Sequence, residues 1–179
     1  MFSVGLVTSE QDLSGILALQ AASRAPTADG FVTVQHTLDI LRAMDALAPS
    51  VVARDAAGTV VAYAITMPRE TRALIPILEP MFQRLEQQLP PTTRFYVMGQ
   101  IAVAPSHRGS GAFDALYAAH RTHYRERFDL LITEVATRNT RSMRAHERVG
   151  FRTLETYRDA TDEWALITWD WQAPPARSA

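Results

Sequence analysis

The sequence Ile101-Ala-Val-Ala-Pro-Ser-His-Arg-Gly-Ser-Gly-Ala-Phe113 joins an apolar segment to a helix through two closely spaced glycines. At such a junction, backbone N–H groups converge without intrahelical partners at the positive end of the helix dipole. Gly109 and Gly111 carry no side chain that would block a close anion. The stretch therefore predicts a nest for a pyrophosphate. The alternative is a strand–helix turn that uses glycine only for its dihedral angles.

Two well-known phosphate loops do not fit this stretch. The chain has no lysine, and all 18 of its basic residues are arginine, so it lacks the Gly-Lys-Ser/Thr end of a Walker A loop. The dinucleotide-binding pattern needs a third Gly or Ala at position 114, which is Asp114 here. The missing lysine also excludes a Schiff-base enzyme, and the absence of cysteine excludes disulfides, thiolate zinc sites and a cysteine acyl-enzyme.

The composition is that of an ordinary globular protein. The length of 179 residues fits one domain, and 47% of the residues are hydrophobic. A net charge of −1 predicts neither nucleic acid nor an anionic membrane as a partner. The N-terminus lacks the basic region of a signal peptide, and no apolar run is long enough to span a bilayer. We expect a cytoplasmic protein.

Periodicity predicts interleaved strands and helices, and hence one α/β domain with a largely buried sheet over residues 1–172. Residues 24–33 are predicted to form a loop, and the Pro/Ala/Arg tail at 173–179 is predicted to be disordered. The predicted strands are 4–7, 51–53, 60–67, 95–103, 130–136, 151–158 and 163–171, and the predicted helices begin near 9, 34, 80, 110 and 139.

A second motif follows the strand predicted at 130–136. Residues 139–151 read Asn-Thr-Arg-Ser-Met-Arg-Ala-His-Glu-Arg-Val-Gly-Phe. Together with the Gly-rich loop, this motif resembles the GNAT superfamily of N-acetyltransferases, which carries V-x-P-x-x-R-G-x-G and then N-x-x-S/A-x-x-x-Y-x-x-x-G-F. Both motifs occur in order and at the customary separation, and two coordinated motifs are far more specific than either alone.

The resemblance implies a mixed central sheet of about seven strands, flanked by helices and splayed between the fourth and fifth strands, where acetyl-CoA enters as co-substrate. Two positions depart from the family pattern: Phe113 stands where the family usually has Gly or Ala, and His146 replaces the frequent Tyr. The residues that the resemblance assigns to the cofactor are Ile101, Ala102 and Val103 beside the pantetheine, His107, Arg108, Gly109, Ser110, Gly111, Ala112 and Phe113 around the pyrophosphate, and Asn139 and Ser142 from the next helix.

Two side chains are candidates for the proton transfers that acylation of an amine requires. Glu134 shares a strand face with Leu130 and Ile132, and burial there would raise its pKa toward the range useful for a base. In some family members a Glu twelve residues before the Tyr is proposed as the base, and Glu134 and His146 keep that spacing. His146 could protonate the leaving sulfur while it is charged. The alternatives are a structural glutamate and a packing histidine.

The predicted acceptor is a primary amine of a small molecule or a protein, attacked directly in a ternary complex because no cysteine is present to carry the acyl group. Tyr96 and Gln100 are candidates to line its site, near residues 24–36, 68–94 and 160–162. The spacing of His120 and His123 could chelate a metal, but with no third ligand evident we expect no metal.

Two rival hypotheses remain open. The Tyr-to-His change at position 146 is compatible with a domain that binds acyl-CoA, or senses it, without turnover. A nucleotide-binding domain of the Rossmann type is the other rival, and stabilisation by NAD but not by CoA would identify it. The oligomeric state is open, a homodimer included.

Overall fold

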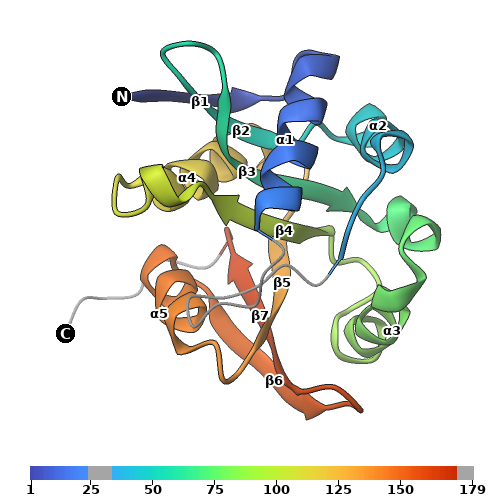
Figure 1. Ribbon diagram of the computed structural model, residues 1–179. Coiled ribbons are helices and arrows are strands. Elements are labelled where there is room, and N and C mark those ends of the chain that lie inside the picture. The colour runs from blue at the N-terminus through green and yellow to red at the C-terminus, as the bar shows by residue number, and fades with distance from the viewer. Residues whose placement is uncertain (24–33, 173–179) are drawn as a thin grey trace.

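In the computed structural model, which describes residues 1–23 and 34–172, seven strands form one mixed sheet in the order β1-β2-β3-β4-β5-β7-β6 (Figure 1). Neighbouring strands are antiparallel except β4 and β5, which are parallel. This is the mixed α/β sheet that the sequence predicts. The strands are β1 (Phe2–Leu6), β2 (Val51–Asp55), β3 (Val60–Pro68), β4 (Phe95–Val103), β5 (Leu130–Ala136), β6 (Arg152–Arg158) and β7 (Glu163–Asp170).

Helices cover both faces of this sheet. Apolar side chains of α1, α2 and α3 pack in one core cluster, and those of α4 and α5 pack in the other. Figure 1 shows α1 lying across the middle strands of the sheet. The helices are α1 (Glu10–Ala22), α2 (Leu38–Leu47), α3 (Glu79–Gln88), α4 (Ala112–Tyr124) and α5 (Thr140–Val149), with 3-10 turns at Arg69–Leu74, Pro76–Leu78 and Pro105–His107.

Side-chain caps set the first residues of several helices. Ser9 and Asp12 form a capping box at the start of α1. Thr37 has an extended backbone, and its side chain accepts a hydrogen bond from the N–H of Ile40. Helix α2 therefore begins at Leu38, and the predicted start near position 34 was wrong. The predicted loop at 24–33 and the predicted disordered tail at 173–179 lie outside the described residues.

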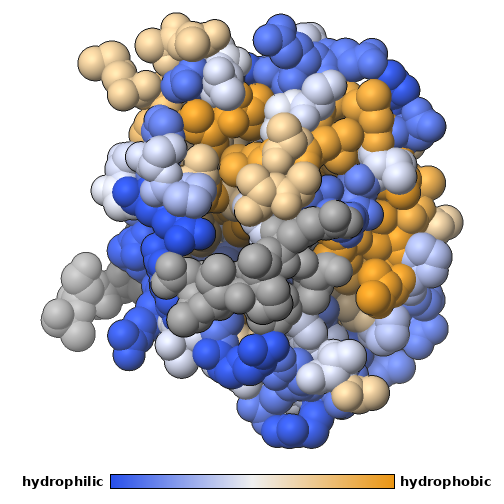
Figure 2. Space-filling model, in the orientation of Figure 1, coloured by the Kyte–Doolittle hydropathy of each residue, from blue (hydrophilic) through white to orange (hydrophobic). Residues whose placement is uncertain are grey.

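The segment between β3 and β4 carries α3 and two 3-10 turns. Met81, Phe82 and Leu85 of α3 are buried in the same core cluster as the side chains of α1 and α2. Ile77, in the second 3-10 turn, is 70% exposed. Figure 2 shows apolar side chains on the side of the molecule where this segment lies. The segment is therefore a packed part of the domain and not a loose loop.

The middle of the sheet opens between β4 and β5. Their paired residues run only from Phe95↔Leu130 to Val97↔Ile132, although both strands continue beyond that point. The hydroxyl of Thr133 donates to the carbonyl of Met98 at 2.9 Å, next to the last pair. The strands then separate, as the sequence resemblance implies.

A bulge in β4 lies at the same level. Ala64 pairs with Ile101 but Thr66 pairs with Met98, so Gly99 and Gln100 together face one residue of β3. A Cβ on Gly99 would lie 2.1 Å from the sulfur of Met67, so only glycine fits there. The bulge brings Gln100 onto the sheet face covered by α1, where its side chain meets Gln20.

Candidate active site

A cavity of about 870 Å³ lies beside the end of β4, beyond the last residue of β4 that pairs with β5. Its walls are the end of β4, the loop that leads into α4, the first turn of α4 and one side of α5, with Ala22 and Ser23 at the end of α1. The two sequence motifs, residues 101–113 and 139–151, therefore face each other across one space.

Nearly all of the predicted cofactor residues line this cavity. Ser110 is the exception, and its hydroxyl turns back to donate to the carbonyl of His107 at 2.6 Å. The predicted residues that line the cavity are Ile101, Ala102, Val103, His107, Arg108, Gly109, Gly111, Ala112, Phe113, Asn139 and Ser142.

The two glycines of the loop have left-handed backbone conformations. The φ angle is 73° at Gly109 and 84° at Gly111, values that side-chain-bearing residues adopt only at a cost. No atom lies within 4 Å of where a Cβ would stand on either residue. Gly111 is also the N-cap of α4, and within the described residues no side chain caps this helix. The loop thus combines two glycines without side chains with a helix start that lacks a side-chain cap, and such helix starts bind anionic groups.

The two departures from the family pattern meet in one contact. The ring of Phe113 packs edge-on against the ring of His146, with 5.1 Å between centroids, and against Tyr117 at the same distance. Phe151 completes this cluster from the other side of His146. A large residue at position 113 therefore forms both part of the cavity wall and part of the aromatic core beneath it.

His146 belongs to this core. It is 1% exposed, its Nε2 lies 2.7 Å from the hydroxyl of Tyr117, and its Nδ1 lies 2.8 Å from the carbonyl of Ser142. A carbonyl can only accept, so Nδ1 donates and Nε2 accepts from the tyrosine. Burial lowers the pKa of His146 to about 4. The residue does not line the cavity. This geometry favours the packing role, and the acid role stays a prediction with no contact in its support.

Glu134 lies on β5 beyond the last residue pair between β4 and β5. Its neighbours on the same strand face, Leu130 and Ile132, belong to the core cluster of α1, α2 and α3, on the sheet face opposite α4 and α5. Tyr157 of β6 donates a hydrogen bond to its carboxylate. The pKa of Glu134 is raised to about 7, chiefly by burial, with the charge of Asp159 adding to the rise and that of Arg84 opposing it. A carboxyl group of this kind can accept a proton at neutral pH.

Gln100 belongs to a buried polar network on that same face. Its amide oxygen accepts from the hydroxyl of Tyr63 and, at 2.7 Å, from Nε2 of Gln20. Its amide nitrogen donates to the carbonyl of Val34 at 2.9 Å. Nδ1 of His36 lies 2.9 Å from Nε2 of Gln20, and burial lowers the pKa of His36 to about 4. The network ties the start of the segment before α2 to the bulge in β4.

Tyr96 lies on the opposite face of the sheet, the face of α4 and α5, and is not among the residues that line the cavity. It is fully buried, and its hydroxyl lies 2.9 Å from Nδ1 of His120. Its ring packs against Tyr124, Phe128 and Trp171. This position gives no support to the predicted substrate-lining role. Within residues 1–23 and 34–172, no three metal-ligating side chains come close enough to hold an ion.

Several polar residues around Glu134 and Gln100 were not predicted from the sequence. Tyr157 lies 23 positions after Glu134 and reaches it from β6. Gln20 and Tyr63 contact Gln100 from α1 and β3. No spacing rule connects residues on separate elements, so only the pairing of the strands reveals these contacts.

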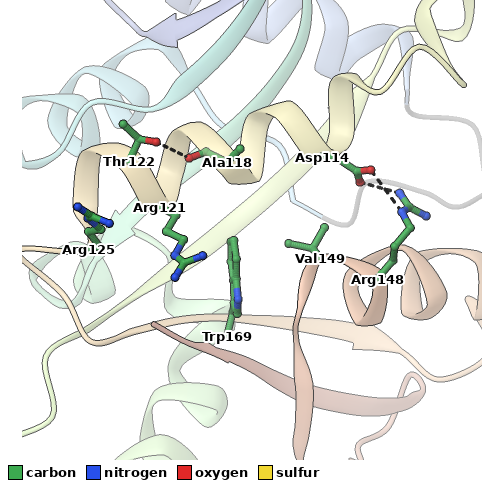
Figure 3. Close-up of a pocket in the computed structure, with 8 residues that line it drawn as sticks. All are labelled: Asp114, Ala118, Arg121, Thr122, Arg125, Arg148, Val149 and Trp169. Atoms are coloured by element: carbon green, nitrogen blue, oxygen red, sulfur yellow. Dashed lines mark hydrogen bonds and ion pairs between the residues drawn. The ribbon is translucent and has the colours of Figure 1, made fainter. Parts of the chain in front are cut away.

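A second hollow of about 650 Å³ adjoins the first, along α4 and β7 (Figure 3). The ion pair between Asp114 and Arg148, at 2.6 Å, borders both spaces. The guanidinium of Arg121 lies 5.9 Å from the centre of the Trp169 ring.

None of the helices in the described ranges combines the length and apolar character that crossing a bilayer requires.

A family model described as "Acetyltransferase (GNAT) family" matches residues 19–151 of the chain. No curated protein sequence matches it. Among solved structures, the chain resembles the ribosomal-protein-S18-alanine N-acetyltransferase of Escherichia coli at 14% identity and a TM-score of 0.68, covering 100% of this chain and 99% of that one.

Two further structures resemble the chain over nearly their whole length. The ribosomal-protein-alanine N-acetyltransferase of Brucella melitensis is 19% identical with a TM-score of 0.68, over 94% of this chain and 99% of that one. A putative acetyltransferase of Salmonella typhimurium, solved with its cofactor acetyl-CoA, is 14% identical with a TM-score of 0.67, over 99% and 98% of the two chains. At these identities the structural likeness shows the fold.

Proposed function

The chain belongs to the acetyltransferase (GNAT) family, and on that premise we propose that it transfers the acetyl group of acetyl-CoA to a primary amine by direct attack in a ternary complex. The observation that carries the proposal is the loop at Gly109 and Gly111, two glycines with left-handed backbone conformations. This loop leads into α4, which has no side-chain cap, and it lines the cavity beside the end of β4. In this proposal the loop holds the pyrophosphate, and the cavity that continues to Asn139 and Ser142 holds the remainder of acetyl-CoA.

The family's reaction joins groups that lie on the two faces of the sheet. The loop and α5 would hold the cofactor on one face, and Glu134 stands on the other, beyond the point where β4 and β5 separate. An acceptor amine that approached from the face of Glu134 would meet the thioester in the opening. This arrangement keeps cofactor and acceptor apart until the acetyl carbon lies between them.

Glu134 is the proposed general base. The amine nitrogen attacks the thioester carbon, its proton passes to the Glu134 carboxylate directly or through one water, and the carbon–sulfur bond then breaks with its electron pair on sulfur. The pKa of Glu134, raised to about 7 by burial, suits this step. A thiol with a pKa of about 8.5 can leave as its thiolate without being protonated by an acid. The reaction therefore needs no proton from His146.

The acceptor is an amine that can reach Glu134 from the side of α1, α2 and α3. Two of the resembling structures are named as N-acetyltransferases of a ribosomal-protein alanine. A peptide α-amine is therefore one class to test, beside small-molecule amines. An α-amine has a pKa of about 7.7–8.0 and is partly neutral near pH 7.5, which suits a base of moderate strength.

Two measurements test the proposal. Calorimetric titration with acetyl-CoA is expected to give saturable binding, with NAD as the matched nucleotide that does not bind. Thiol release from acetyl-CoA is then followed with a panel of peptide and small-molecule amines, and at least one is expected to support turnover. Binding without release for any amine would favour the non-catalytic sensor, and binding of NAD without CoA would contradict the family's chemistry.

A further inference from the structure

A chain of contacts links α3 to the carboxylate of Glu134. The hydroxyl of Tyr157 donates to Oε1 of Glu134. The guanidinium of Arg84 lies 4.0 Å from the centre of the Tyr157 ring. The same guanidinium donates to Oε1 of Glu155 at 2.9 Å, and Gln88 donates to the other oxygen of Glu155. Each group in this chain therefore has a defined partner.

The three central residues come from three separate elements. Glu134 is on β5 and Tyr157 on β6, and β7 lies between these strands because Leu166 pairs with Glu134 on one side and with Glu155 on the other. Two strand spacings amount to about 10 Å, so only a long side chain such as tyrosine can bridge them. Arg84 is supplied by the segment between β3 and β4.

The contacts leave Glu134 with one oxygen bonded to a neutral donor and no direct ion pair among the described residues. A hydroxyl donor orients a carboxylate without neutralising it, so the second oxygen keeps its lone pairs for an incoming proton. Arg84 is held away from the carboxylate by Glu155, and its cation–π contact fixes the Tyr157 ring instead.

We propose that Tyr157 is the positioning residue of Glu134, and that Arg84 holds Tyr157 in place so that helix α3 supports the base from outside the site. The catalytic meaning of this arrangement rests on the proposed function of Glu134. The contact itself does not, because it can be measured in the protein without acceptor or cofactor.

The charges around Glu134 set the direction of the expected effect. The charge of Asp159, in the turn after β6, raises the pKa of Glu134, and the charge of Arg84 on α3 lowers it. Glu155 of β6 is paired with Arg84, and the residue of β7 opposite Glu134 is the uncharged Leu166. The Tyr157 hydroxyl bonds to the charged form of the carboxylate and stabilises it. Removing that hydroxyl is therefore expected to raise the pKa of Glu134.

The test is Tyr157→Phe, compared with Tyr124→Phe as the matched control. Tyr124, in the other core cluster, is also a buried tyrosine whose hydroxyl is bonded, but it donates to the carbonyl of Pro49. Carbon-13 NMR of carboxyl-labelled protein, with the Glu134 signal assigned by its loss in Glu134→Gln, follows the titration directly. We expect the Glu134 midpoint to rise by about one pH unit in Tyr157→Phe, a tenfold change in the proton equilibrium, and to stay unchanged in Tyr124→Phe.

Turnover gives the second readout. If the midpoint rises from about 7 to about 8, kcat of Tyr157→Phe falls to about one fifth of wild type at pH 7 and returns close to wild type above about pH 9. Taking the ratio to wild type at each pH cancels the titration of the acceptor amine. A purely structural role would lower kcat equally at every pH.

Arg84→Met is the second variant, with Arg42→Met as its control because Arg42 forms exposed ion pairs on α2. Arg84→Met is expected to raise the NMR midpoint of Glu134 in the same direction, and Arg42→Met to leave it unchanged. An unshifted midpoint in a folded Tyr157→Phe protein would overturn the inference. A shifted midpoint with a kcat ratio independent of pH would support the contact and overturn Glu134 as the base, so the two failures are distinguishable.

Discussion

The hydroxyl of Tyr117 lies 2.7 Å from Nε2 of His146, inside a core of aromatic rings. The histidine of the second motif is therefore a neutral hydrogen-bond acceptor, enclosed by Phe113, Tyr117 and Phe151. Since the family usually has a tyrosine at position 146 and a small residue at 113, the two changes occupy one shared space. The packing explains why a bulky residue is tolerated at the edge of the cofactor cavity.

His146→Gln tests this structural role. We expect the free energy of unfolding to fall by about 1–3 kcal/mol, because a buried hydrogen bond and ring contacts are lost. We expect kcat to stay within about twofold of wild type, because both ring nitrogens of His146 are engaged inside the core and burial lowers its pKa to about 4, so it holds no proton to donate at neutral pH. A general acid is worth about a hundredfold or more. His120→Gln, at another buried histidine bonded to a tyrosine, is the control for stability. A fall in kcat of more than about a hundredfold in folded His146→Gln would restore the acid role.

Gly111→Ala tests the loop. The φ angle of 84° makes alanine strained there by about 1 kcal/mol, and its methyl group would stand in the open space where an anion would bind. We expect a loss of acetyl-CoA affinity of at least about tenfold by calorimetry, equal to about 1.4 kcal/mol.

The matched control is Gly58→Ala, which has the same strain at a φ of 82° and equally open surroundings, but in the turn between β2 and β3. It should lose similar stability in denaturant unfolding and keep its affinity. Equal affinities for Gly111→Ala and Gly58→Ala would mean that the loop does not hold the pyrophosphate.

The stability of the protein should depend on its buried histidines between pH 6.5 and pH 5. Burial lowers the folded-state pKa of His36 and His146 to about 4 and that of His120 to about 3, from 6.5 in the unfolded chain. Below pH 6.5 the unfolded chain therefore binds more protons than the folded chain, and each buried histidine lowers the free energy of unfolding as the pH falls. Glu134, whose pKa is raised to about 7, acts in the opposite sense.

Urea unfolding of His146→Gln measures one of these contributions. Between pH 6.5 and pH 5 the variant should lose about 1.6 kcal/mol less than wild type, since a full proton per molecule accounts for about 1.4 kcal/mol per pH unit and the unfolded histidine is half protonated at pH 6.5. Parallel stability curves for the two proteins would show that His146 takes up its proton equally in both states, against the burial seen here.

The sequence predicted elements wherever the pattern was local. The bounds of β4 and β5 agree with the prediction because each is an apolar run between turn residues. The predicted start of α2 near position 34 was wrong because the prediction used only the spacing of apolar residues and not the capping residue Thr37. The loop and the second motif were found from spacing alone, and the fold brings them to one cavity.

The face on which a side chain lies was harder to predict. Tyr96 and Gln100 are four positions apart, so simple alternation puts them on one face. The bulge at Gly99 and Gln100 adds one residue to β4, and Gln100 therefore turns to α1 while Tyr96 turns to α4. Tyr157 gave no signal at all, because its contact with Glu134 depends on the order of β5, β7 and β6 in the sheet.

Glu134→Gln tests the central claim most directly. Steady-state thiol release from acetyl-CoA with the best amine of the panel gives kcat, and calorimetry gives the Kd of acetyl-CoA for the same protein. Glu147→Gln, an exposed glutamate on α5, is the matched control. We predict that Glu134→Gln lowers kcat by about a hundredfold or more, in the range of general base catalysis, with Kd within about twofold of wild type, and that the control changes neither. Normal turnover in Glu134→Gln would contradict the assignment of the base.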